Sequence, residues 1–357
     1  MSRVSQHPDG VGTDVLSPRT TVYRAGRGAT RAPAPSPSGP GRRRWPVILL
    51  ALLLIPVLLL TGLFVWADRQ VQHVAALPGD ARPDQNPGTD YLIVGSDSRA
   101  GLSREEKRSF STGTAAGRRA DTIMLLHDGA AGATLVSLPR DSYVPIPGRE
   151  RNKLNAAYAF GGPRLLSKTV EQVTGVRLDH VVEVDLRGFV GIVDAVDGVR
   201  LCLDDPLQDA AAGIDLRAGC QQLAGPEALG YVRARKSDPR GDLGRVERQQ
   251  QFLAALSDRV ASPGTLANPV NAVRVTDATL EALRVDRDTG IVDLARLGLA
   301  MRAVSGRDGT RTTVPVADID YPVAGVGSTV LWDRDRALEL FRAIQADEPV
   351  SAAADGP

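Results

Sequence analysis

The residues best suited to chemistry in this sequence are arginines and aspartates at the edges of short apolar runs. YLIVGSDSRAG places Asp97 and Arg99 directly after such a run, and RRADTIMLLH places Arg119 and Asp121 directly before one. Guanidinium forks bind phosphate oxygens through paired hydrogen bonds, and carboxylates supply the hard oxygen ligands that Mg²⁺ or Mn²⁺ takes when it bridges to phosphates. Further polar residues lie at the edges of apolar elements elsewhere in the chain: Arg118, Arg140, Lys153, Arg233, Arg235, Arg245, Arg248 and Gln249. Together these residues predict a pyrophosphate–metal site.

Each of these segments alone also fits an ordinary structural role. Ser96 and Asp97 suit an Asx-turn after a strand, and Arg233 and Arg235, which share one face if they lie on a strand, suit a solvated rim. The charge balance favours a site instead. Residues 1–44 hold eight Arg and two Asp, which leaves 35 basic and 40 acidic residues in the rest of a chain that has 43 and 42. Arginines therefore cluster in a region of net negative charge, and a nucleic-acid-binding domain, which would be basic, is disfavoured.

Signals of covalent catalysis are missing from the sequence. It has no G-x-S-x-G elbow, P-loop or dinucleotide-binding glycine fingerprint. The four histidines, His7, His73, His127 and His180, do not show metal-ligand spacing. His180 precedes an apolar run and is interpreted as a structural histidine.

The elements that must position these residues alternate between strand and helix patterns. Apolar β-branched runs predict strands over 91–95, 122–127, 133–138, 181–186, 199–203 and 312–316. Amphipathic patterns predict helices over 165–173, 186–196, 245–260, 265–273, 276–283, 291–304 and 333–344. This alternation is typical of an α/β fold with helices on both faces of a central sheet.

An uncharged apolar segment from Trp45 to Ala67 predicts one transmembrane helix. At ~1.5 Å per residue it is long enough for a hydrocarbon core of ~30 Å. Three arginines, at 42–44, precede it, and the positive-inside rule places the N-terminus in the cytoplasm and the rest outside the cell. The apolar run is too long, and starts too far into the chain, for a signal peptide.

The predicted organisation follows from these features and from composition. It comprises a disordered cytoplasmic tail (1–44), the transmembrane helix (45–67), an extracytoplasmic spacer (68–88), a catalytic domain (89–260), a C-terminal part of the extracytoplasmic domain (261–347) and a disordered tail (348–357).

The two cysteines, Cys202 and Cys220, both fall in the predicted outer region. In an oxidising compartment such a pair predicts a disulfide, with two free buried thiols as the alternative. Closing a loop of this size contributes roughly 3 kcal/mol.

The succession of motifs resembles the LytR–CpsA–Psr (LCP) family of cell-envelope proteins, from about Asp90 to Leu256. The resemblance rests on the blocks YLIVGSDSR, RRADTIMLLH, LVSLPRDSYVPIPG, NKLNAAYAFGG, TVEQVTGVRLDHVVEVDLRGFVGIVDAVDGV and YVRARKSDPRGDLGRVERQQQF in this order. It implies an α-β-α layered domain with a central mixed sheet. The implied activity is a Mg²⁺-dependent transferase that moves a glycopolymer from a polyprenyl-pyrophosphate lipid to a peptidoglycan sugar hydroxyl in cell wall biogenesis.

The resemblance also implies roles for single residues. Asp97 and Asp121 match the metal-associated aspartates, and with Arg119 they are the predicted catalytic residues. The predicted pyrophosphate-binding residues are Arg99, Arg119, Arg140, Lys153, Arg233, Arg235, Arg245 and Gln249, whereas Arg118 and Arg248 match less closely. An apolar slot for the prenyl chain is expected along Phe189, Val190, Ile192, Val193 and Val196 with strand residues 181–184, for each of which ordinary core is the alternative.

Two other functions are open, and the first of them uses the same residues. One is a polyprenyl pyrophosphate phosphatase, in which water replaces the sugar hydroxyl. The other is a non-catalytic lipid-binding or regulatory envelope protein. The sequence leaves open which glycopolymer is moved and which residue accepts the proton.

Overall fold

Side chains of the strand β2 (Thr89–Ser96) alternate between two apolar cores in the computed structural model of the chain. Leu92 and Val94 pack into one core, and Tyr91 and Ile93 pack into the other. A period of two with both faces buried is the pattern of a central strand covered on each side. The structure describes residues 45–79, 82–98, 102–110, 119–234, 242–306 and 309–350.

Helices and strands follow the predicted alternation closely. The helices are α1 (Trp45–Gln70), α2 (Arg104–Ser109), α3 (Leu154–Thr174), α4 (Leu186–Ala195), α5 (Gly225–Arg233), α6 (Asp242–Val260), α7 (Pro263–Leu266), α8 (Pro269–Ala282), α9 (Ile291–Ser305) and α10 (Arg334–Gln345). The strands besides β2 are β1 (Gln72–His73), β3 (Ala120–Gly129), β4 (Gly132–Ser137), β5 (Tyr143–Val144), β6 (Asn152–Lys153), β7 (His180–Asp185), β8 (Val199–Leu203), β9 (Leu207–Asp209), β10 (Ile214–Leu216), β11 (Gly219–Leu223), β12 (Leu283–Val285), β13 (Thr310–Thr313), β14 (Val316–Val323) and β15 (Gly327–Trp332).

Seven strands form the central sheet, in the order β1-β12-β7-β2-β3-β4-β13. β2 runs parallel to β7 and antiparallel to β3, and β13 runs parallel to β4. The sheet is therefore mixed, as the family resemblance implied. β2 and β7 are parallel, and β3 is antiparallel to β2. The C-terminal ends of β2 and β7 therefore lie beside the N-terminal end of β3, along the edge of the sheet formed by the strand ends.

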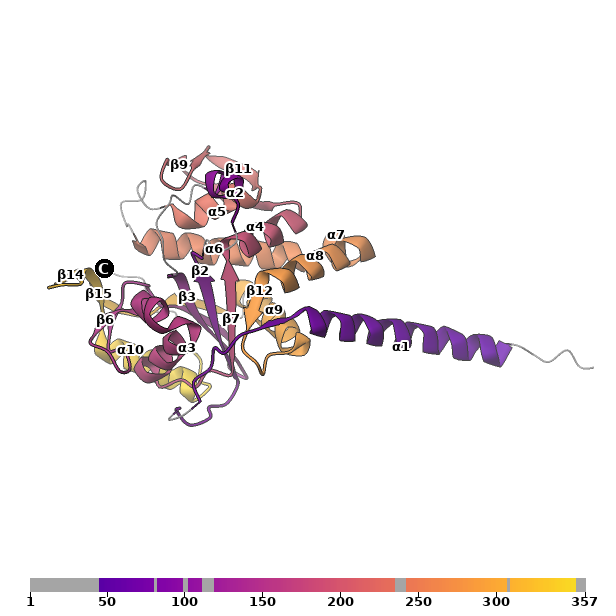
Figure 1. Ribbon diagram of the computed structural model, residues 1–357, viewed down its shortest axis with the longest axis horizontal. Helices are drawn as coiled ribbons and strands as arrows, with labels where there is room; N and C mark the ends of the chain where they lie inside the picture. The colour runs from indigo at the N-terminus through magenta and orange to yellow at the C-terminus, as the bar shows by residue number, and fades with distance from the viewer. Residues whose placement is uncertain are drawn as a thin grey trace, which may run out of the picture. The chain divides into compact units, whose positions relative to one another are not determined.

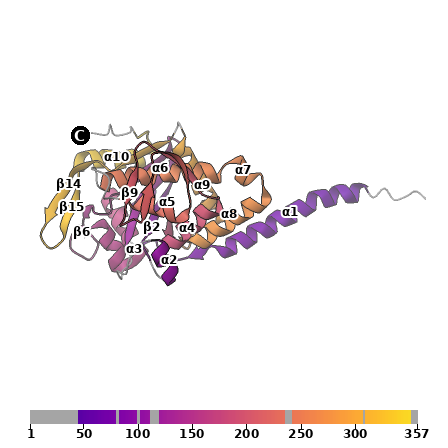
Figure 2. The same cartoon turned by 90° about the horizontal axis from the view of Figure 1, so that it is seen from above.

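Helices cover both faces of this sheet, which confirms the predicted α-β-α layering. On one face, α3 and α10 contribute Leu166, Val170 and Phe341 to the core that contains Leu92. On the other face, α9 contributes Leu297 to the core that contains Tyr91. Figures 1 and 2 show these helices on opposite sides of the strands.

A third apolar core lies beyond the edge where β2 and β7 end. It joins α4, α5 and α6 to the arm formed by β8, β9, β10 and β11. Figure 1 shows these elements gathered above the strand ends. α4 follows β7 without a break, because Asp185 ends the strand and caps the helix by accepting a hydrogen bond from the Gly188 N–H at 2.9 Å. This core and the sheet edge together enclose a cavity lined by Asp97, Asp121 and Arg245.

Chain segments outside the predicted catalytic domain also contribute to the sheet. β12 and β13 come from the part beyond residue 260, and β1 comes from the predicted spacer. Spacer residues also pack inward, since Ala76 is buried in the core beneath α3. The C-terminal part and part of the spacer are thus integral to the sheet.

Several local expectations differ from the structure, and the helices expected over 265–273 and 276–283 are replaced by the short helix α7 and one continuous helix, α8. Arg233, considered above as a strand residue, is the last residue of α5, a helix that begins with Gly225 and Pro226. A helix predicted to reach Leu283 ends at Ala282, where the chain becomes β12 and pairs with β7. Over a few residues a sequence pattern fits a helix and a strand equally well. Tertiary pairing and packing then determine which of the two forms.

The helix α1 begins where the uncharged segment of the sequence begins and continues to Gln70. Within the described ranges, no helix is long and apolar enough to cross a membrane. The anchor at 45–67 therefore stays a prediction. The chain divides into two units between Ile55 and Pro56, inside this helix, and the fold described here is that of the second unit.

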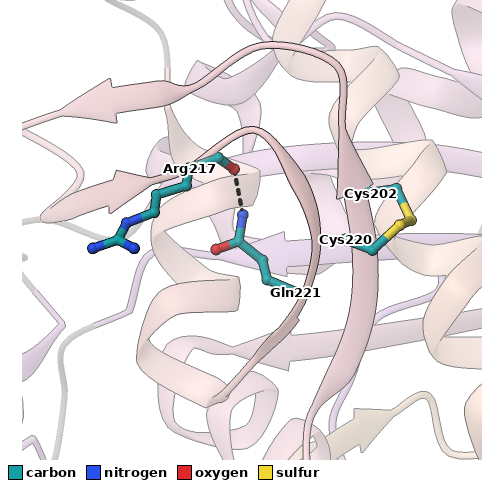
Figure 3. The surroundings of a disulfide bond; sticks show 4 residues. All are labelled: Cys202, Arg217, Cys220 and Gln221. Atoms are coloured by element: carbon teal, nitrogen blue, oxygen red, sulfur yellow. Dashed lines mark hydrogen bonds between the residues drawn. A yellow bond between two sulfur atoms is a disulfide. The ribbon is translucent and has the colours of Figure 1, made fainter.

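The predicted disulfide between Cys202 and Cys220 is present (Figure 3). It joins β8 to β11 at directly opposite positions, and the chain between the two strands forms the β9–β10 hairpin. Beside it, the Gln221 Nε2 donates to the Arg217 carbonyl at 2.6 Å (Figure 3). The arm is therefore closed at its base by a covalent bond.

Removing this disulfide is expected to lower the free energy of unfolding by roughly 3 kcal/mol, because the open arm gains conformational freedom when the chain unfolds. Cys202→Ser combined with Cys220→Ser tests this in a urea titration. Wild-type protein measured in reductant serves as the control and should match the double variant. Equal stability of oxidised wild type and double variant would contradict the expectation.

Candidate functional site

A β-bulge in β3 sets the position of Asp121. Gly95 pairs with Thr122 and the next residue, Ser96, pairs with Ala120, so Asp121 is the extra residue of β3. A bulge bends the strand and changes the direction of the side chain at the extra residue. At Gly95 a Cβ atom would lie 2.9 Å from the Thr122 Cβ, so the close approach of β2 and β3 here requires glycine.

Asp97 is tied to the same strand by backbone contacts. Its carboxylate accepts a hydrogen bond from the Arg119 N–H at 2.6 Å, and its own N–H donates to the Arg119 carbonyl at 2.9 Å. These contacts hold the end of β2 against the beginning of β3. Asp97 and Asp121 are separated in the sequence. In the fold they line one cavity.

That first cavity has a volume of about 330 Å³ and two kinds of lining. One part is apolar and includes Val184, Leu186 and Phe189 from β7 and α4. The other part is polar and is formed by Asp97, Asp121, Arg233, Arg245 and Gln249. Such a cavity suits a ligand with an apolar chain joined to an anionic group.

The polar side chains of α6 reach this cavity from the first turns of the helix. Arg245 is only 2% exposed, and its Nη2 donates to the Asp121 carbonyl at 3.4 Å. Gln249, one turn further, donates from Nε2 to the Val232 carbonyl at 3.2 Å. Arg248 does not line the cavity; it donates from Nη2 to the Ala234 carbonyl at 2.7 Å and so holds the end of α5.

A second cavity, of about 390 Å³, holds the other predicted cations. Its lining includes Arg119, Arg140 and Lys153. Arg140 donates from Nη1 to Asp121 Oδ1 at 2.5 Å and from Nε to Asp141 Oδ2 at 3.3 Å. Lys153 Nζ lies 3.1 Å from Asp141 Oδ1. The predicted single set is therefore divided between two cavities, and the Asp121–Arg140 ion pair joins them.

Two of the predicted pyrophosphate-binding residues, Arg99 and Arg235, lie outside the described residues, as does Arg118. Arg233 is described, lines the first cavity and donates from Nη1 to the Phe110 carbonyl at 2.8 Å.

The expected apolar slot is only partly made of the predicted residues. Phe189 and Val184 line the first cavity, whereas Val190, Val193 and Val196 are buried in the core of α4, α5 and α6. Val190 and Val193 lie on α4 and Val196 is its C-cap residue, and all three belong to this core, so ordinary core is correct for them. Ile192 and residues 181–183 are not part of the lining either. Instead the lining is completed by Leu186, Ala211, Ala212 and Val232.

Two carboxylates of the first cavity, Asp185 and Asp209, were not predicted. Asp185 caps α4, and Asp209 Oδ1 accepts from the Ala211 and Ala212 N–H groups at 2.9 and 3.2 Å. Both hold local backbone turns. The sequence signal for Asp185 was available, because an Asp directly before an amphipathic helix is a capping residue.

The described residues contain no group of three or more His, Cys, Asp and Glu side chains that could hold a metal ion. Asp97 and Asp121 nevertheless fit Mg²⁺ in one specific sense. They line one cavity, and Mg²⁺ is commonly held by one or two carboxylates together with substrate phosphates and water.

His127 and His180 both have structural surroundings. The His180 ring stacks on Tyr91 with 4.9 Å between centroids, and its Nδ1 lies 2.8 Å from the Thr289 hydroxyl. His127 lies between two carboxylates, with Nδ1 3.0 Å from Asp90 and Nε2 3.3 Å from Asp347. The structural interpretation of His180 thus agrees with its contacts.

The two carboxylates around His127 predict a pH dependence of stability. Burial alone lowers the pKa of His127, but the hydrogen bonds and charges of Asp90 and Asp347 outweigh it, so the pKa is raised. A group with a raised folded pKa stabilises the fold fully below its unfolded pKa of ~6.5, and this contribution is lost as pH rises through the folded value. Melting temperature is therefore expected to fall as pH increases above ~6.5. His127→Gln should flatten this part of the profile, and His73→Gln, at an exposed position, should not. An unchanged slope in His127→Gln would count against the assignment.

Comparison with known proteins decides the family. A model described as the LytR_cpsA_psr family matches residues 68–338. The chain belongs to the LytR–CpsA–Psr family. LcpB of Corynebacterium glutamicum, named as a probable cell wall biosynthesis protein, is 40% identical over 331 residues, which cover 89% of this chain and 78% of LcpB. TagU of Oceanobacillus iheyensis is 29% identical, covering 82% of this chain and 92% of TagU.

Solved structures of LytR–CpsA–Psr proteins share the fold. A LytR-Csp2A-Psr enzyme from Actinomyces oris superposes with a TM-score of 0.60 at 24% identity, over 76% of this chain and 96% of that one. TagT bound to LIIa-WTA gives 0.57 at 24% identity, over 77% and 99%. The fold and the family predicted from the sequence are confirmed.

Proposed function

We propose that this LytR–CpsA–Psr protein is a phosphotransferase of cell wall assembly. It moves a glycopolymer from a polyprenyl-pyrophosphate carrier to a sugar hydroxyl of peptidoglycan and releases prenyl phosphate. One observation carries the proposal: the first cavity joins apolar walls to the buried Arg245, the half-buried Arg233 and the carboxylates of Asp97 and Asp121. The name of its relative TagU, a polyisoprenyl-teichoic acid–peptidoglycan teichoic acid transferase, supports the same reaction class.

The charges of the cavity suit each stage of this reaction. The acceptor oxygen attacks the phosphorus that bears the glycopolymer, and a new P–O bond forms. The P–O bond to the carrier breaks, and its electron pair leaves on the bridging oxygen of prenyl phosphate. The hydroxyl proton passes to a carboxylate of the pair Asp97 and Asp121. Arg233 and Arg245 neutralise the charge that develops on the phosphoryl oxygens, which is the main demand of phosphoryl transfer.

Apolar residues of the same cavity would hold the carrier. Val184, Leu186 and Phe189 lie beside the polar group, so a prenyl chain placed along them brings its pyrophosphate to the arginines. We further propose that Asp97 and Asp121 hold Mg²⁺ with the substrate phosphates. When bound, the ion would supply positive charge to the pyrophosphate.

The predicted anchor at 45–67 completes the proposal. A lipid-linked donor stays in the membrane, and an enzyme tethered by a transmembrane helix, with its N-terminus in the cytoplasm, would meet that donor at the outer membrane surface. An alkaline phosphatase reporter fused after residue 88 is expected to be active outside the cell. An active reporter only in the cytoplasm would contradict this orientation.

The reaction is tested with the full-length chain in detergent, a prenyl-pyrophosphate oligosaccharide, peptidoglycan fragments and Mg²⁺. A covalent product detected by mass spectrometry supports transfer. Prenyl phosphate without that product supports the phosphatase, and neither product supports a non-catalytic binding protein. Adding a chelator tests the metal, and equal activity of wild type and Arg233→Ala would show that the site is assigned wrongly.

A further inference from the structure

The helix α2 connects the two layers that enclose the first cavity. It lies in the chain between Asp97, at the end of β2, and Arg119, which precedes β3. The residues on either side of it, Leu102 and Phe110, are only 7% and 6% exposed, and both pack into the third apolar core with α4, α5 and α6. Figure 1 shows α2 among the elements above the strand ends. A connection between two strands of the sheet is thereby fixed to the layer above them.

The end of α2 contacts Arg233, a cation of the first cavity. Arg233 is the last residue of α5, and its Nη1 donates to the Phe110 carbonyl at 2.8 Å. The helix sets the direction of that carbonyl, because the Phe110 N–H donates to the Glu106 carbonyl at 2.8 Å and the Phe110 side chain is buried. A hydrogen bond to a fixed acceptor restricts the rotamers that a long guanidinium side chain would otherwise sample.

A second contact fixes α2 to α4. Arg187, the second residue of α4, donates from Nε to Glu106 Oε1 and from Nη2 to Glu106 Oε2, both at 2.8 Å. This is the bidentate geometry in which a guanidinium binds a carboxylate with the greatest specificity. The neighbouring Leu186 lines the first cavity. The ion pair therefore joins α2 to the wall of that cavity.

Glu106 also stabilises the first turn of α2. Its Oε2 accepts from the Ser103 N–H at 2.7 Å, and the Ser103 Oγ accepts from the Glu106 N–H at 3.1 Å, which is a reciprocal capping box. An isolated helix of six residues is not stable in water. The position of α2 therefore depends on this capping box and on its contacts with α4 and the third apolar core.

From these contacts we infer that α2 is a positioning element for the reaction, in which Glu106 and Arg187 are the positioning residues that hold Arg233 in the first cavity. The inference rests on the proposed function, in which Arg233 neutralises charge on the phosphoryl oxygens. The contacts run from Arg187 through Glu106 and the Phe110 carbonyl to the Arg233 guanidinium. When α2 is loosened, Arg233 samples more rotamers, and each substrate that binds must order it again.

Binding of a short prenyl pyrophosphate to the full-length chain in detergent tests the inference. Glu106→Gln keeps an oxygen for the capping box but removes the charge that pairs with Arg187, and it is expected to weaken binding roughly three- to fivefold. Arg187→Gln should have the same effect, whereas Arg187→Lys, which keeps the charge, should stay within about twofold of wild type. Glu105→Gln is the matched control, because it removes the same charge from an exposed position of the same helix and should leave binding unchanged.

A double-mutant cycle shows whether Glu106 acts through Arg233. In an Arg233→Ala background, Glu106→Gln is expected to cause no further loss of binding, because the side chain that α2 positions is gone. In an Arg245→Lys background the loss should return, since Arg245 is held from α6. Equal losses in the wild-type and Arg233→Ala backgrounds would overturn the inference, and so would equal binding by wild type and Glu106→Gln.

Melting temperature and hydrogen exchange separate positioning from folding. The Arg187 and Glu106 side chains are 57% and 28% exposed, so Glu106→Gln should melt within about 2 °C of wild type. The amides of residues 104–110 should exchange faster in this variant, and those of α10 should not change. A fall in melting temperature of more than about 5 °C would show that the pair supports folding and would contradict a positioning role.

Binding and transfer are measured on the same proteins, so the inference and the proposed function can fail separately. Wild type that binds prenyl pyrophosphate but forms no covalent product with peptidoglycan would refute the proposed transfer, and the binding cycle would still test the role of α2. An active transferase in which Glu106→Gln and Glu105→Gln behave alike would refute the inference alone.

Discussion

Arg245→Ala is expected to reduce kcat/KM for glycopolymer transfer about 10²- to 10³-fold, the size of effect seen when one preorganised donor to a developing anion is removed. Arg245 is 2% exposed, lines the first cavity with Asp97 and Asp121, and donates to the Asp121 carbonyl. A guanidinium held in place before the substrate arrives stabilises the phosphoryl charge without reorganising in the reaction. Steady-state assays with the lipid-linked donor measure kcat/KM of the variant and of wild type.

Two further variants show whether the effect is catalytic. Arg245→Lys keeps the charge but cannot donate in the paired geometry, so an intermediate loss is expected. Arg302→Ala changes an exposed arginine on α9 and should keep wild-type activity. Thermal melting of each protein separates lost activity from lost folding. A folded Arg245→Ala protein with activity within twofold of wild type would remove Arg245 from the site.

The largest effect on stability is expected at Arg82, in the predicted spacer. Its Nε and Nη2 donate to Glu171 Oε1 at 2.9 and 2.7 Å, and Nη2 also donates to the Leu178 carbonyl. Glu171 is 2% exposed and accepts from the Leu178 N–H at 3.0 Å. Removing one partner of a buried ion pair leaves a buried charge without compensation, so Arg82→Ala should lower the free energy of unfolding by about 3–5 kcal/mol.

A double variant distinguishes loss of the ion pair from loss of packing. Arg82→Leu combined with Glu171→Leu removes both charges and is expected to recover most of the stability lost in Arg82→Ala. Lys168→Ala, at an exposed position of α3, is the control and should stay within ~0.5 kcal/mol of wild type. Chemical denaturation gives all four values. A loss below ~1 kcal/mol in Arg82→Ala would show that this part of the spacer contributes little.

Most of the sheet was predictable, because its strands are buried on both faces. β2, β3, β4 and β7 read as short apolar runs bounded by polar residues, and all four occur where the sequence placed them. The hairpin β14–β15 was missed, because many of its side chains are exposed and its sequence lacks an apolar alternation. β12 was missed since three residues following a helix give no periodic signal.

The site was predictable as a set of residues but not as an arrangement. Motif order identified Asp97, Asp121 and Arg245, and the structure brings all three to one cavity. The division of the cations between two cavities depends on which strand end lies beside which helix, and only the tertiary fold determines that. The lining by Ala211 and Ala212 was not predictable either, because small residues of an arm carry no chemical signal.

The bulge at Asp121 has a consequence for how a relative of this protein could lose its activity. Since Asp121 is the extra residue at the irregularity in the pairing of β3 with β2, deleting a single residue there would restore regular pairing between the strands. The apolar side chains from Ile123 onward would keep their faces, and the domain would still fold. The carboxylate would be gone from the cavity, and Arg140 would keep only its contact with Asp141 of these two carboxylates. A paralogue shortened by that one residue is therefore expected to keep the architecture and to lack this carboxylate.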